Sequence, residues 1–137
     1  MPRPPKSGGA VFMPRSFADN RKKFGRTGTR LTAGPVDSPH QSAAELQHAI
    51  ANRVREYLLD ENTTLRAYCE NRPLAAGLTN DRFERIMRGE TMITLTDLMF
   101  WAAEIPDFSN FMGATVGELV AVTARKAPPA TGRDEDQ

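Results

Sequence analysis

The chain has 137 residues and a net charge of +1, and it contains a single cysteine. This length allows about one domain, and one cysteine excludes an intrachain disulfide and any multi-cysteine zinc site. The longest apolar run, Leu98–Ala103, is far shorter than the roughly 20 residues of a membrane span, and no apolar segment of secretory length follows the basic N-terminus. We therefore expect a soluble, cytoplasmic protein without membrane contact.

Charge and composition divide the chain into two parts. Residues 1–41 hold eight basic and two acidic residues, a net charge of +6, whereas the rest hold ten basic and fifteen acidic, a net charge of −5. Residues 1–41 also lack a sustained apolar period, which predicts a disordered basic arm. The arm is either a segment that orders on nucleic acid or a solubilising tail. In the first case, its phosphate or minor-groove contacts are expected from Arg15, Arg21, Lys22, Lys23, Arg26 and Arg30.

From Ser42 onward the pattern is helical. Ser42 and Glu45 form a capping box, and an apolar stripe follows, which predicts a scaffold helix over 42–61. A shorter helix is expected over 63–71, with Thr63 or Thr64 as its cap. Pro73 ends it and is placed to open one further helical turn over 73–76.

Two glycines, Gly77 and Gly89, bracket the next helix. Thr79 or Asn80 caps it, and it runs to about residue 88, where Gly89 stops it. Its apolar positions fall on one face at helical spacing and its arginines fall on the other. The apolar positions are Phe83, Ile86 and Met87.

Two more helices complete the pattern. Thr94 and Asp97 form a capping box for a helix that Pro106 closes, and Thr115 and Glu118 form a capping box for a short final helix. We expect an all-α domain of about five helices over 42–125, followed by a disordered acidic tail over 126–137.

Catalytic chemistry has little support in this sequence. His40 lies in the linker and His48 on the expected exposed side of the first helix, and neither has a nucleophile or metal-ligand partner nearby in the pattern. No glycine-rich phosphate loop follows a strand, because no strand is predicted. We expect no enzymatic activity, no metal and no cofactor.

DNA recognition fits the helix over 79–88 better. A helix pinned by apolar residues can present its outer face to the major groove, where arginine pairs with guanine and asparagine with adenine. Arg82 or Arg85 is placed for guanine and Asn80 for adenine, whereas Thr79 and Arg88 are better placed for phosphates.

The two acidic residues of this helix allow a second interpretation. Asp81 and Glu84 can accept from a cytosine amino group, or they can pair with Arg85 and Arg88 one turn on. In the second case the segment is an ordinary exposed helix with alternating charges.

The stretch 63–119 resembles the helix-turn-helix family of Cro and phage repressors, also called the XRE family. G-L-T-N-D-R-F-E-R-I-M-R-G is similar to that family's turn and recognition helix, T-L-T-D-L-M-F-W-A-A-E-I to the following scaffold helix, and A-T-V-G-E-L to a short closing helix. The inserted N-R-P-L before Gly77 departs from the family pattern. The resemblance implies a lambda-repressor-like fold. By position it implies base contacts at Asn80, Asp81, Glu84 and Arg85 and phosphate contacts at Thr79 and Arg88, with Arg82 exposed near them.

The expected function is therefore sequence-specific binding of double-stranded DNA in transcription regulation. We expect a two-fold homodimer, because one short helix reads few bases. Two alternatives remain. The chain is a protein-interaction module that presents its acidic body or the patch of Phe108, Phe111 and Met112 to a partner, or it is an antitoxin-like regulator that binds both DNA and a protein.

Overall fold

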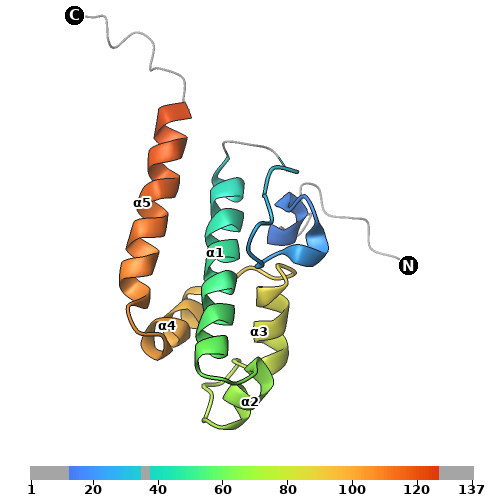
Figure 1. Ribbon diagram of the computed structural model, residues 1–137, viewed down its shortest axis with the longest axis vertical. Coiled ribbons are helices and arrows are strands. Elements are labelled where there is room, and N and C mark those ends of the chain that lie inside the picture. Colours follow the sequence, from blue (N-terminus) through green and yellow to red (C-terminus); the bar gives the residue numbers. More distant parts are fainter. Residues whose placement is uncertain (1–12, 35–37, 127–137) are drawn as a thin grey trace, which may run out of the picture.

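The computed structural model describes residues 13–34 and 38–126. These residues form two short 3-10 helices and five α-helices and contain no strand, which confirms the all-α prediction. Helix α1 (Pro39–Asp60) is central, and α5 (Phe108–Lys126) runs beside it in the opposite direction (Figure 1). The helices α2 (Leu65–Glu70), α3 (Asn80–Met87) and α4 (Leu95–Glu104) lie around the C-terminal half of α1.

Threonine caps set the start of three helices, as predicted. The side chains of Thr64, Thr79 and Thr94 each accept a hydrogen bond from the backbone N–H three residues on, and Asp97 completes a capping box with Thr94. Helix α1 begins at Pro39 rather than near residue 42, because the Ser38 side chain caps it and proline fits a first helical turn.

Two predicted helical segments are wrong. Residues 71–79 connect α2 to α3 without a helical turn, and the Leu78 N–H donates to the Ala75 carbonyl (3.0 Å) in a turn that contains Gly77 at φ +87°. The final helix begins at Phe108 instead of near Thr115. The Thr115 hydroxyl donates back to the Phe111 carbonyl (2.8 Å) inside α5, so it does not act as a cap.

The segment 13–34 corrects the predicted disorder of the arm. It contains the 3-10 helices η1 (Pro14–Phe17) and η2 (Arg21–Lys23), and η1 packs on α1. Phe17, Phe24 and Leu31 are at most 5% exposed and belong to the core. Full burial of such a side chain stabilises by about 1.5–3 kcal/mol, which offsets the entropy cost of ordering the segment. The rest of the predicted arm up to residue 37, and the tail from residue 127, lie outside the described residues.

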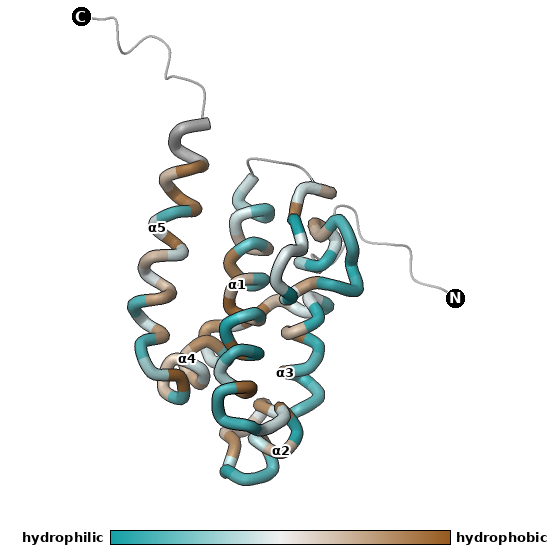
Figure 2. Tube along the Cα trace, in the orientation of Figure 1, coloured by the Kyte–Doolittle hydropathy of each residue, from teal (hydrophilic) through white to brown (hydrophobic). Residues whose placement is uncertain are grey.

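The core lies where α1, α3, α4, the start of α5 and the N-terminal segment meet. Its largest fully buried side chains include Trp101, Phe83, Phe24 and Phe108. Trp101 stacks on Tyr68, and its ring centre lies 5.3 Å from that of Phe83, so it joins α4 to α2 and α3. The trace of α4 is largely apolar, whereas α3 and the N-terminal segment are largely hydrophilic outside these contacts (Figure 2).

Candidate nucleic-acid interface

Helix α3 buries one face and exposes the other. Thr79 caps it by accepting from the Arg82 N–H (3.1 Å). Its apolar residues, Phe83, Ile86 and Met87, are 6% exposed or less. The opposite face carries the exposed side chains of Asp81, Arg85 and Arg88. Among the residues that the structure describes, Arg85 has no ion-pair partner, so its guanidinium is open to a ligand.

The structure gives Arg82 a different role from the predicted one. Its Nε donates to Asp97 Oδ1 (2.9 Å) and its Nη2 to Asp97 Oδ2 (2.6 Å), a bidentate pair with a carboxylate that is fully buried. Burial acts to raise the pKa of Asp97, but hydrogen bonds from Arg82 and from the Thr94 N–H and hydroxyl outweigh it, so the pKa lies below its ordinary value. Arg82 joins α3 to the start of α4, and Asp97 occupies the Nε and Nη2 donors on one edge of its guanidinium.

Two other predicted contact residues are only partly available. The side-chain amide of Asn80 is buried and has no hydrogen-bond partner in the described part of the chain, so a base contact requires it to rotate outward. Glu84 lies 3.9 Å from Arg88, the i,i+4 pair that the sequence allowed, and Arg88 Nε also donates to Glu90 (2.7 Å). Arg88 is therefore partly neutralised by its neighbours.

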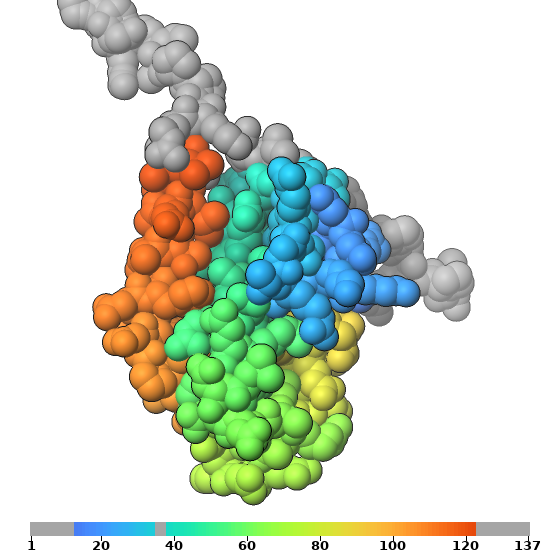
Figure 3. All heavy atoms as spheres, viewed as in Figure 1, coloured from blue at the N-terminus to red at the C-terminus, as the bar shows by residue number. Residues whose placement is uncertain are grey.

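The N-terminal segment docks on the C-terminal end of α3. Gly89 follows α3 with φ +74°, and a Cβ there would lie 2.8 Å from the Phe24 ring and 2.9 Å from the Arg15 Cβ. The Arg15 N–H donates to the Gly89 carbonyl (3.0 Å). Glycine at this position therefore allows both the turn and the close approach of the N-terminal segment. That segment covers part of α1 next to α3 (Figure 3).

His48 and Gln47 of α1 complete this junction, and the sequence pattern did not indicate either. His48 Nδ1 accepts from the Gly25 N–H (2.8 Å) and the His48 ring meets the Phe24 ring edge-on, so His48 is not on an exposed side. Burial, assisted by Arg55, lowers the pKa of His48. Gln47 is 1% exposed and binds Ile86, Thr91 and Ile93 backbone groups, which fixes the end of α3 and the following loop to α1.

The docked segment brings most of the predicted arm cations to the surface. Arg15 is half-buried and forms an ion pair with Glu90 (3.5 Å). The other five side chains are exposed. They are Arg21, Lys22, Lys23, Arg26 and Arg30. Since the segment contacts Gly89 at the end of α3, it holds these exposed cations near that end of the helix.

The long connection between α2 and α3 is anchored at Arg72. Its guanidinium lies 3.7 Å from the centre of the Tyr68 ring and its Nη1 lies 3.3 Å from Glu104. Tyr68 also hydrogen-bonds Glu104 and Tyr57, and burial and these bonds raise its pKa. The inserted residues are thus held against α4 although they contain no helix.

Comparison with protein-family models, with curated proteins and with solved structures finds no match to this chain. Within residues 13–34 and 38–126, none of the helices has the length and apolarity that a membrane crossing demands. The same residues contain no group of three His, Cys, Asp or Glu side chains that could hold a metal ion.

Proposed function

We propose that this protein binds double-stranded DNA sequence-specifically and regulates transcription, with α3 as the recognition helix of a Cro-like helix-turn-helix unit. One observation carries the proposal: the basic segment 13–34 is docked on the end of α3, beside the exposed face that holds Arg85. A major-groove helix needs such a face, and flanking cations on a rigid support supply the phosphate contacts that position it.

The proposed contacts follow from exposure. Arg85 reads a base, Asp81 accepts from a neighbouring base amino group, and Arg88 and Thr79 face phosphates. Arg21, Lys22 and Lys23 supply further phosphate contacts from η2. Arg82 is left out, because its bidentate pair with Asp97 holds its guanidinium against the start of α4.

A homodimer belongs to the same proposal. Residues 116–118 and 120–122 of α5 are exposed, and Val116 and Val120, one turn apart, are 39% and 60% exposed. A second copy of α5 is the proposed cover for these valines, because paired half-sites multiply the contacts that one short helix can make.

Selection of bound sites from random DNA, with the parent and with Arg85→Ala, tests the proposal. We expect an enriched site for the parent, and an Arg85→Ala cost of about 1–3 kcal/mol with relaxed preference at one position. Neutralising Arg21, Lys22 and Lys23 to glutamine should weaken binding to all sequences and flatten log K against log salt by up to about 2.7, since each lost phosphate contact removes about 0.9. Arg66→Gln, on the exposed side of α2, gives the comparison for a single lost charge.

A protein partner is the second candidate, and exposed apolar residues on α4 favour it. Leu95 and Met99 lie one turn apart and are 79% and 65% exposed. If the selection returns no enriched site and the Arg85→Ala protein behaves like the parent with every sequence, the interaction-module or antitoxin-like function replaces DNA reading.

A further inference from the structure

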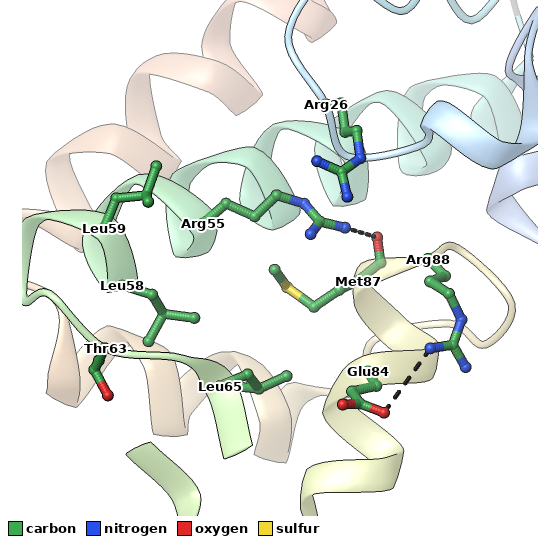
Figure 4. A pocket seen from close by; sticks show the side chains of 9 residues that line it. All are labelled: Arg26, Arg55, Leu58, Leu59, Thr63, Leu65, Glu84, Met87 and Arg88. Carbon is green, nitrogen blue, oxygen red and sulfur yellow. Dashed lines mark hydrogen bonds and ion pairs between the residues drawn. The ribbon is translucent and has the colours of Figure 1, made fainter. Parts of the chain in front are cut away.

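A pocket of about 460 Å³ opens between α1, the start of α2, the end of α3 and the N-terminal segment. Its volume falls within the range of small-molecule sites, about 300–1,000 Å³. Figure 4 shows two kinds of lining on opposite sides. The guanidinium groups of Arg26, Arg55 and Arg88 lie on one side, and the side chains of Leu58, Leu59 and Leu65 lie on the other.

The arginine side carries unbalanced positive charge. Arg55 donates only to backbone carbonyls among the described residues, to Gly25 (3.3 Å) and Met87 (3.3 Å). Arg26 has no ion-pair partner there. Arg88 is paired with Glu84 (3.9 Å), the one carboxylate in the lining, and with Glu90 (2.7 Å) outside it, so the uncompensated charge lies on Arg26 and Arg55. Burial lowers the pKa of Arg55, and repulsion from Arg26 and Arg88 lowers it further. An anion between these groups would relieve that repulsion.

The leucine side carries apolar surface that is exposed to solvent. Leu59 is 77% exposed although it borders a concave pocket, and Leu58 and Met87 continue the apolar lining inward. Covering apolar surface stabilises by about 25 cal/mol per Å². A fully hydrated ion such as phosphate would leave the leucine side of the pocket exposed to water.

From these two linings we infer that the pocket binds a small amphipathic anion, a carboxylate on an aliphatic body, with its head between Arg26, Arg55 and Arg88 and its tail on Leu58 and Leu59. The pocket shares Arg88 with the proposed phosphate contacts but does not include Arg85, and its occupation is measured without DNA. Failure of one proposal is therefore distinguishable from failure of the other.

Octanoate is the probe, with acetate, octylammonium and inorganic phosphate as matched comparisons. Titration calorimetry and amide chemical-shift mapping on the full chain should show octanoate binding with shifts around residues 55–65 and 84–88. Acetate lacks the tail and octylammonium has the wrong charge, so both should bind at least tenfold more weakly. The inference is overturned if either matches octanoate, or if phosphate does, because the apolar side or the charge then contributes nothing.

Variants locate the site. Arg88→Gln and Leu59→Gln should each weaken octanoate binding at least fivefold. Arg66→Gln and Leu95→Gln alter exposed residues of the same types elsewhere and should leave the octanoate affinity unchanged. Leu59 is largely exposed, so its replacement keeps the fold, and thermal melting checks this. Equal octanoate affinity in Leu59→Gln and Leu95→Gln would also overturn the inference.

Discussion

The pairing of Arg82 with Asp97 yields the sharpest test of how α3 is held. Asp97 is 0% exposed and accepts from Arg82 Nε and Nη2 as well as from the Thr94 N–H and hydroxyl. Removing one partner of a buried ion pair costs about 3–5 kcal/mol, because the other charge stays buried. The Arg82 side chain is 23% exposed and Thr94 keeps its two bonds in the variant, so Arg82→Ala should fall at the lower end, about 3 kcal/mol.

Thermal and urea unfolding measure this loss. About 3 kcal/mol corresponds to a fall in Tm of about 12 °C, at about 4 °C per kcal/mol for a domain near 100 residues. Arg82→Lys, which keeps the charge but loses the bidentate geometry, should lie between the parent and Arg82→Ala. In a double-mutant cycle with Asp97→Asn, the two losses should add to more than the loss in the double variant.

The effect of pH gives an independent check. The folded-state pKa of Asp97 is below its ordinary value of 3.8, so the pairing contributes its full stability above pH 3.8 and loses it as the pH falls through the lower folded pKa. The difference between the parent and Arg82→Ala should therefore shrink in acid. The reasoning is refuted if Arg82→Ala melts with the parent at pH 7 while base preference changes at one position, since Arg82 would then read DNA.

Two further predictions concern the docked N-terminal segment. Gly89→Ala should destabilise the domain and detach the segment, because the new Cβ would lie 2.8 Å from the Phe24 ring and the residue has φ +74°. Hydrogen exchange at the Phe24 amide should therefore rise. Gly113→Ala is the control, because a Cβ there meets nothing within 4 Å and should leave the exchange at Phe24 unchanged. The folded-state pKa of His48 is below 6.5, so the unfolded chain binds the proton more readily and stability should fall as the pH drops below 6.5. His48→Gln should flatten that dependence in urea melts at pH 5 and 7, and an unchanged slope would place the sensitive group elsewhere.

The starts of α2, α3 and α4 and the two faces of α3 could be predicted from the sequence. Thr64, Thr79 and Thr94 cap their helices through bonds that span three residues, and the apolar face of α3 follows from the 3.6-residue period. Gly89 ends α3 at positive φ for a reason that is equally local. Such features need only the residues of one or two helical turns, so a single sequence determines them.

Only the tertiary structure decided that the N-terminal segment is folded onto α1, and which α3 side chains are free to contact a ligand. Phe17 and Phe24 have no local period, and they are ordered by burial against α1 and Gly89, far away in the chain. Arg82 looks free on a helical projection, yet its Nε and Nη2 donate to Asp97, fifteen residues on. Burial and ion pairing depend on which distant segments meet, and the free energy of those contacts is absent from any local pattern.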